Sequence, residues 1–305
     1  MLVREAVACL VHLPHGTYVD GTAGLGGHSA AILDELAGKG QLICLDRDPE
    51  AVRWCQERLS PFSNVRFVRA NFADLDEVMK DLGLEEVDGV LLDLGMSSYQ
   101  LEKSGRGFSF SREEPLDMRM NPENELTAHH LVNDLPAEEL EDILRSYGEE
   151  KRARTIAKAV VRSRAKSPIE TASQLAGVVE ATSPVSRQYR RRHPATRTFQ
   201  ALRIAVNREL QSLDRFLDKI PSLMATGGRL VVLSYHSLED RRVKQAMMGW
   251  ERTCTCPPDF PRCVCGKVPL YRRLFKKGLK PDPTEIENNP RARSAVMRAA
   301  ERVML

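Results

Sequence analysis

The segment Asp20-Gly21-Thr22-Ala23-Gly24-Leu25-Gly26-Gly27-His28 lies between a short apolar run, Thr17–Val19, and a segment with helical apolar spacing, His28–Leu36. Glycines between a strand and a helix let the backbone pass close to a ligand, because they carry no Cβ. The segment therefore predicts a ligand-binding loop at the carboxyl end of a first β-strand.

The first hundred residues alternate short apolar runs with amphipathic segments, a pattern typical of β-α-β units and a parallel sheet. Further strands are expected at Gln41–Leu45, Val65–Val68 and Gly89–Leu92, and further helices at Pro49–Leu59 and Leu75–Leu82. Asp48 stands directly before Pro49, so we expect it to cap that helix.

After the fourth strand this alternation stops, and residues 113–207 are charge-rich and helical in pattern. Strand patterns return at Arg229–Ser234 and at Ser294–Val303. The sequence therefore predicts an α/β protein with a Rossmann-like sheet formed by residues 1–112 and 208–305. Residues 113–207 are predicted to form an all-helical domain for substrate recognition, inserted between the fourth and fifth strands.

Length and composition favour a two-domain protein, since 305 residues with 42% hydrophobic content are enough for one α/β domain and a smaller unit. No stretch approaches the roughly 20 apolar residues that a membrane span needs, and the N-terminus has no signal-peptide core. We therefore expect a cytoplasmic protein that does not bind membranes.

The charges are segregated along the chain although the net charge is only +3. Lys151–Lys166 and Arg187–Arg208 each contain seven Lys or Arg and no acid, whereas Asp134–Glu150 is acidic. This pattern favours a surface that meets RNA phosphates, and a solvated helical face is the alternative for either run alone. Within the first run, basic residues recur at Arg154, Lys158, Arg162 and Lys166, while Ala153, Ile156, Ala157 and Val160 mark another face.

The spacing of the loop glycines, at positions 21, 24, 26 and 27, does not fit a dinucleotide site, which needs G-x-G-x-x-G. This disfavours a dehydrogenase. No lysine stands where a phosphate-binding P-loop needs one. With these two sites disfavoured, the remaining interpretation is a loop that contacts the sugar and amino-acid part of a nucleoside cofactor.

Three residues at the ends of later strands support a nucleoside cofactor. Asp46 ends the second strand, where a carboxylate can accept hydrogen bonds from both ribose hydroxyls. Phe72 follows the third strand and can stack on an adenine, and Asp93 ends the fourth. Carboxyl ends of parallel strands share one edge of a sheet, so we expect these side chains to converge on one ligand.

Seven motifs run nearly from end to end of the chain, and together they resemble the bacterial 16S ribosomal RNA cytosine-N4 methyltransferases, the MraW or RsmH family. The motifs are YVDGTAGLGGHS (Tyr18–Ser29), LLDLGMSSYQL (Leu91–Leu101), RGFSF (Arg106–Phe110), PLDMRM (Pro115–Met120), HPATRTFQALR (His193–Arg203), SYHSLEDR (Ser234–Arg241) and NPRARS (Asn289–Ser294). Two features depart from the family: a histidine-containing segment that usually precedes Leu2 is missing, and Tyr99 stands where proline is common.

The resemblance implies methyl transfer from S-adenosylmethionine to the exocyclic N4 of a cytidine in the decoding centre, with 16S ribosomal RNA or the small ribosomal subunit as partner. It also implies a helical domain inserted into the methyltransferase fold. The positions that it assigns to the cofactor are Gly26, Gly27, His28, Asp46, Phe72, Asp93 and Gln100.

Asp93 is the first candidate for a catalytic residue, since a carboxylate there can contact the cofactor or accept a proton from the target amine. His236, which follows the fifth strand, is the second, with a structural role at a helix start as the alternative. For contacts to RNA phosphates the candidates are Arg190, Arg191, Arg192 and Arg197.

Four of the seven cysteines, Cys254, Cys256, Cys263 and Cys265, fall within twelve residues and could bind one zinc ion through four thiolates. Their C-x-C spacing is tighter than the usual C-x-x-C, so a set of reduced surface thiols is the alternative. Two other functions stay open: an amino-methyltransferase on another RNA or on DNA, and a non-catalytic RNA-binding assembly factor.

Overall fold

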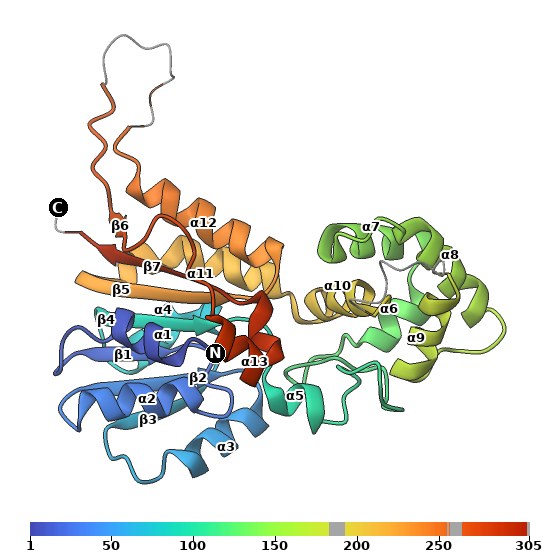
Figure 1. Ribbon diagram of the computed structural model, residues 1–305, viewed down its shortest axis with the longest axis horizontal. Coiled ribbons are helices and arrows are strands. Elements are labelled where there is room, and N and C mark those ends of the chain that lie inside the picture. The colour runs from blue at the N-terminus through green and yellow to red at the C-terminus, as the bar shows by residue number, and fades with distance from the viewer. Residues whose placement is uncertain (183–192, 255, 257–263, 304–305) are drawn as a thin grey trace. The chain divides into compact units, whose positions relative to one another are not determined.

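The structure is a computed structural model that describes residues 1–182, 193–254, 256 and 264–303. It divides into two compact units (Figure 1). The first contains Met1–Gly95 and Leu210–Leu305, and the second contains Met96–Glu209. The first unit therefore comes from two separate parts of the chain.

A seven-stranded sheet forms the centre of the first unit, in the order β3-β2-β1-β4-β5-β7-β6. Strands β1 to β5 are parallel, and β7 is antiparallel to both β5 and β6. The strand bounds are β1 Thr17–Asp20, β2 Gln41–Asp46, β3 Val65–Arg69, β4 Val87–Asp93, β5 Met224–Ser234, β6 Tyr271–Arg273 and β7 Val296–Arg302. The strand order reverses between β1 and β4, and ligands bind outside the carboxyl ends of strands at such a point.

Helices cover both faces of this sheet (Figure 1). Side chains of α1, α2 and α3 pack on one face, and those of α4, α11 and α12 pack on the other. Successive residues of a strand point to opposite faces, so Tyr18 joins the first core and Val19 the second. The bounds are α1 Val3–Leu10, α2 Gly27–Leu36, α3 Pro49–Arg58, α4 Leu75–Asp81, α11 Glu209–Leu223, α12 Ser237–Glu251 and α13 Pro283–Asn288.

The predicted α/β class is confirmed, and each predicted strand coincides with an observed one. Asp48 caps α3 as expected, since its side chain accepts a hydrogen bond from the Glu50 amide at 3.1 Å. The sequence did not predict β6 or α1. β6 has three residues, two of them arginines, too few to show an apolar alternation.

The regular secondary structure described in the second unit is helical, apart from one isolated β-bridge between Pro115 and Thr171, and an irregular segment joins Glu102 to Ala128. Its helices are α5 Ser98–Glu102, α6 Ala128–Asp134, α7 Ala137–Gly148, α8 Ala153–Arg164, α9 Ala172–Ala181 and α10 Thr196–Asn207. The predicted apolar face of α8 is confirmed, because all four of its residues are buried in the core of this unit: Ala153, Ile156, Ala157 and Val160. None of the helices described in either unit is long and apolar enough to cross a membrane.

The second unit begins at Met96, earlier than the predicted residue 113, and ends at Glu209 instead of residue 207. Phe108 and Leu116 are buried in its helical core, and the Arg106 guanidinium donates to the Met120 carbonyl at 3.0 Å. These residues lie in an irregular segment without helical periodicity. Only the packing assigns them to this unit.

Gly148 of α7 packs directly against the backbone of α10, and we expect its replacement by alanine to destabilise the second unit. A Cβ at this position would lie 2.6 Å from the Arg197 carbonyl oxygen and 3.2 Å from the Ala201 Cβ. A helix backbone cannot move away as a side chain can, so Gly148→Ala should cost about 2–3 kcal/mol of unfolding free energy in urea titrations. Gly249→Ala in α12, where a Cβ meets no atom within 4 Å, is the matched control. Equal stability of the two variants would contradict the close packing.

Candidate cofactor and active site

The glycine loop is attached to the ends of two strands at the carboxyl edge of the sheet. The Gly21 amide donates to the Leu91 carbonyl of β4, and the Ala23 amide donates to the Leu45 carbonyl of β2, both at 2.9 Å. Gly24 and Gly26 have φ angles of 52° and 75°, in the left-handed region that favours glycine. The loop conformation therefore requires glycine at these two positions.

Gly21 and Gly27 differ in what surrounds them. A Cβ on Gly21 would lie 2.5 Å from Leu92 Cδ2 and 3.1 Å from Phe72 Cβ, so a side chain there would force the buried Leu92 and Phe72 to shift. A Cβ on Gly27, the first residue of α2, would meet no protein atom within 4 Å. The fold does not require glycine at position 27. The absence of a side chain there leaves open space beside the loop.

Asp46 joins the end of β2 to the glycine loop. Its carboxylate accepts a hydrogen bond from the Gly24 amide and another from the Asp48 amide, each at 2.9 Å. Burial raises the pKa of this carboxyl to about 6, although the two amides oppose the shift. A carboxylate has about four acceptor positions, so two remain for the hydroxyls of a ribose.

Phe72 lies beside the same loop, in a short 3-10 helix that Asn71 caps. Its ring packs edge-on against Phe216, with 5.7 Å between the ring centroids, and the residue is only 9% exposed. Phe72 therefore belongs to the core and lies next to Gly21 at the same time. An adenine at this edge would meet one side of a fixed apolar residue.

Asp93 is the centre of a polar cluster where β4 and β5 end side by side. The Tyr235 hydroxyl donates to Asp93 Oδ1 at 2.5 Å, and the Asp93 amide donates to Thr22 Oγ1 at 2.6 Å. His28 Nδ1 lies 3.4 Å from Asp93 Oδ2, and the Asp93 side chain is 24% exposed. The carboxylate is thus oriented from two sides and is still partly exposed.

Tyr235 is a site residue that the sequence did not predict. Burial, together with the Asp93 charge, raises the pKa of its phenol, so it remains a hydrogen-bond donor. It follows β5 directly, and Leu233 of β5 is the strand partner of Asp93. Asp46 and Asp93 were predicted because ligand residues stand at the carboxyl ends of parallel strands. The same rule, applied to β5, would have predicted Tyr235.

Asp20 and Ser29 form a buried support beneath this cluster. The Ser29 hydroxyl donates to Asp20 Oδ2 at 2.6 Å, and the Thr22 amide donates to Asp20 Oδ1 at 3.1 Å. Burial raises the pKa of the Asp20 carboxyl. Asp20 is 1% exposed, and its hydrogen bonds orient the glycine loop from below.

His236 is the N-cap residue of α12. Its Nε2 lies 3.0 Å from Glu239 Oε1, and the other oxygen of Glu239 accepts from the Tyr235 amide at 2.8 Å. The position of His236 at a helix start agrees with the structural alternative, and its catalytic role stays a prediction. Glu239, through this same contact, also fixes the backbone of Tyr235.

Gln100 lies in the second unit, at the third position of α5. Its side-chain oxygen accepts a hydrogen bond from the Ser97 backbone amide at 3.1 Å, and the Gln100 backbone amide donates to Ser97 Oγ at 3.2 Å. This capping box explains why glutamine and serine stand three residues apart. Its assignment to the cofactor stays a prediction.

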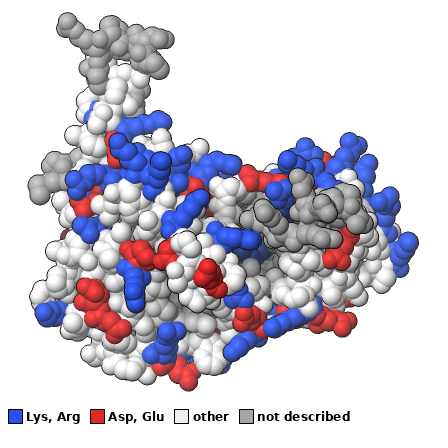
Figure 2. Space-filling model, in the orientation of Figure 1, with Lys and Arg blue, Asp and Glu red and all other residues white. Residues whose placement is uncertain are grey.

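Among the predicted RNA contacts, Arg197 is described and exposed, and its guanidinium donates to the Glu149 carbonyl at the end of α7 at 3.1 Å. Arg190, Arg191 and Arg192 lie outside the described residues. The basic residues that recur every four positions along α8 and just beyond it are all exposed: Arg154, Lys158, Arg162 and Lys166. Lys and Arg side chains gather near α8 in Figure 2, whereas α7 carries mainly Glu and Asp.

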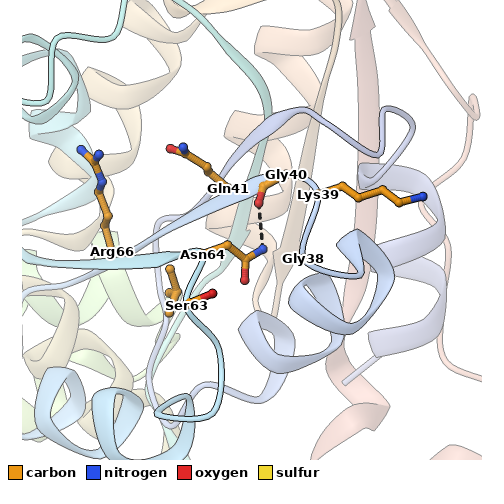
Figure 3. A pocket seen from close by; sticks show the side chains of 8 residues that line it. Gly38, Lys39, Gly40, Gln41, Ser63, Asn64 and Arg66 are labelled. Atoms are coloured by element: carbon orange, nitrogen blue, oxygen red, sulfur yellow. Dashed lines mark hydrogen bonds between the residues drawn. The ribbon is translucent and has the colours of Figure 1, made fainter.

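A polar pocket in the first unit lies far from this site in the sheet (Figure 3). It is lined by residues 38–41 and 63–66, and the Asn64 side-chain amide donates to the Gly40 carbonyl at 2.7 Å. Gln41 and Val65 are the first residues of β2 and β3, so this pocket lies at the amino edge of the sheet. The candidate ligand residues of the first unit lie at the opposite, carboxyl edge.

The sequence matches the model of the MraW methylase family over residues 1–303. A ribosomal RNA small subunit methyltransferase H of Heliobacterium modesticaldum is 47% identical over 305 residues, with 99% of this chain and 97% of the relative covered. A protein of the same name from Nitratidesulfovibrio vulgaris is 49% identical, with 99% and 94% covered. A solved rRNA methylase of Streptococcus thermophilus aligns with a TM-score of only 0.43 at 12% identity, over 99% of this chain and 94% of that one. The chain belongs to the MraW methylase family.

Proposed function

We propose that this methyltransferase moves a methyl group from S-adenosylmethionine to the N4 amine of a cytidine in the decoding centre of small-subunit ribosomal RNA. The observation that carries the proposal is the 44–49% identity, over nearly the whole chain, to relatives named ribosomal RNA small subunit methyltransferase H. The choice of cytidine N4 rests on the family resemblance of the motifs. A carboxylate that can accept an amine proton, Asp93, fits this choice.

The residues at the carboxyl edge fit S-adenosylmethionine, which supplies an electrophilic methyl group on a sulfonium. Asp46 would accept hydrogen bonds from the ribose hydroxyls, and Phe72 would bound the adenine. The open space at Gly27 would take the part of the cofactor that passes along the loop. The loop has no pyrophosphate to bind, in agreement with its glycine spacing.

The protein's task in the reaction is to position a weak nucleophile. The lone pair of the cytosine amine is delocalised into the ring, so orientation of the amine supplies much of the rate. Asp93 would accept a hydrogen bond from the amine, and it would take the proton that the nitrogen loses as the new N–C bond forms. Tyr235 acts as a positioning residue, because its hydroxyl holds one oxygen of that carboxylate.

The target base must leave its stack to reach this edge of the sheet, because the enzyme cannot reach a cytosine amine while the base is stacked and paired inside folded RNA. The RNA around it has to be held by phosphate contacts. The exposed basic face of α8, Arg154, Lys158, Arg162 and Lys166, is the best described candidate for these contacts.

Cofactor affinity should weaken in acid, because Asp46 must be ionised to accept two ribose hydroxyls. Its pKa of about 6 in the cofactor-free protein lies above the ordinary value, so protonation begins to compete with binding below that pH. Calorimetry should give an affinity about tenfold lower at pH 5 than at pH 7. Asp46→Asn should bind weakly with little dependence on pH over this range. A wild-type affinity that stays constant would contradict the role of Asp46.

Replacing Arg154, Lys158 and Arg162 together with alanine should weaken RNA binding and flatten its salt dependence. For every phosphate that the variant no longer neutralises, the slope of log affinity against log salt should fall by about 0.7–0.9. The matched control replaces Lys39, Arg66 and Lys80, which are exposed on the first unit. If both triple variants show the wild-type slope in filter-binding assays at several salt concentrations, α8 does not contact the RNA.

The proposed function is tested by mapping methylated cytidines in small-subunit RNA from cells with and without the gene, by mass spectrometry. We expect one N4-methyl mark to disappear with the gene and to return with the intact gene. Purified protein should methylate small subunits or their RNA and leave duplex DNA unmodified. An unchanged set of marks would overturn the proposal, and activity on DNA alone would favour the DNA alternative.

A further inference from the structure

The segment between α12 and β6 has almost no apolar packing among its described residues. Its described residues, 252–254, 256 and 264–270, form no helix or strand, and Val264 and Val268 are 73% and 58% exposed. Its base is held to α12, because the Leu270 amide donates to the Trp250 carbonyl at 2.8 Å and Lys267 Nζ to the Gly249 carbonyl at 3.2 Å. Whatever orders these described residues has to be something other than a hydrophobic core.

Three thiols meet in this segment. The sulfur atoms of Cys254, Cys256 and Cys265 all lie within 4.8 Å of one another, and those of Cys254 and Cys265 are 3.9 Å apart. Zinc–thiolate bonds of about 2.3 Å in tetrahedral geometry separate two sulfurs by about 3.8 Å. Only a small contraction would bring the three sulfurs to the distances that a shared ion requires.

The backbone around these thiols is shaped to support thiolates. The Cys256 amide donates to Cys254 Sγ at 3.4 Å, and a hydrogen bond of this kind orients a metal ligand and stabilises its negative charge. Gly266, directly after Cys265, has a φ angle of 57°, and a Cβ there would meet no atom within 4 Å. Glycine is therefore needed for the turn and not for packing.

We propose that Cys254, Cys256 and Cys265 bind a structural zinc ion that orders this segment. Soft thiolate ligands select zinc among the common divalent ions, whereas calcium and magnesium prefer oxygen. A disulfide would use two of the three sulfurs and would not explain why the third lies beside them. Three thiolates leave one tetrahedral position for a further donor. Cys263 lies outside the described residues, and the proposal rests on the other three.

The test measures zinc in the full chain, purified without chelators or a polyhistidine tag. We expect about one zinc per chain, and in cobalt-loaded protein the visible and near-ultraviolet absorption of tetrahedral cobalt–thiolate. Cys254→Ser, Cys256→Ser and Cys265→Ser should each lose most of the zinc. Cys9→Ser is the matched control, because Cys9 lies on α1 and is partly exposed. It should retain the zinc and the cobalt spectrum.

A second measurement separates loss of the ion from loss of the fold. The three variants should keep the wild-type far-ultraviolet circular dichroism, because the segment lies outside both cores of the sheet. Limited proteolysis should cut the variants, and the chelator-treated wild type, between α12 and β6. Wild-type protein that takes up no zinc, or variants that retain it, would overturn the proposal. A Cys254–Cys265 disulfide found by intact mass in protein purified under reducing conditions would do the same.

Discussion

Replacing Asp93 with asparagine should slow methyl transfer by about two orders of magnitude, the lower range for removal of a general base. Asparagine has the same shape, and its oxygen can still accept the Tyr235 hydrogen bond, so the fold should be unchanged. It lacks the charge that takes up the proton of the amine. Single-turnover assays with saturating cofactor and RNA would measure this step directly.

The same assay distinguishes the two roles that Asp93 could have. If Asp93 accepts the proton, Asp93→Asn should lower kcat and leave cofactor affinity within about threefold of the wild type. If Asp93 only binds the cofactor, the variant should have a lower cofactor affinity, and its rate at saturating cofactor should equal that of the wild type. Tyr235→Phe removes the hydroxyl that donates to Asp93 and keeps the ring, so it should slow the step by about tenfold, near the value of one such hydrogen bond. A wild-type rate for Asp93→Asn would exclude the proton role.

Gly27→Val should abolish measurable cofactor binding at moderate concentrations without destabilising the protein. Position 27 follows the loop that bonds to Asp46 and precedes His28, which lies beside Asp93. A valine there has room in the cofactor-free structure but would occupy space that the cofactor needs. The overlap should cost up to about 3 kcal/mol, or about 100-fold in affinity by calorimetry.

Gly177→Val is the matched control, because Gly177 is also an exposed helical glycine with no atom within 4 Å of a Cβ. Both variants should melt at or slightly above the wild-type temperature, since valine favours a helix more than glycine does. Only Gly27→Val should lose the cofactor. If it binds S-adenosylmethionine as the wild type does, the cofactor does not pass along this part of the loop.

Much of the first unit could be predicted because its elements are specified locally. Glycine spacing, strand runs of β-branched and aliphatic residues, and an Asp-Pro helix start each act within a few residues. Asp46, Phe72 and Asp93 could be placed together because parallel strands bring their carboxyl ends to one edge. The buried face of α8 could be predicted for the same reason, from a helical period.

What the sequence could not show depends on contacts between distant segments. Tyr235 lies 142 positions from Asp93, and only the pairing of β4 with β5 brings the two together. The start of the second unit at Met96 depends on burial of an irregular segment, which has no period to detect. His236 is followed by glutamate three residues later, a capping pattern that does not decide between its structural and its catalytic role.

The pairing of β4 with β5 also bears on how the chain acquires its structure during synthesis. β4 is made before the second unit and β5 after it. Until Leu233 leaves the ribosome, the edge of β4 that pairs with β5 therefore has no partner. Closing such a long loop is entropically costly and slows folding. The contiguous residues of the second unit can fold first, which shortens the effective loop. A nascent chain stalled before β5 would expose an unpaired apolar strand, where chaperones bind and aggregation begins.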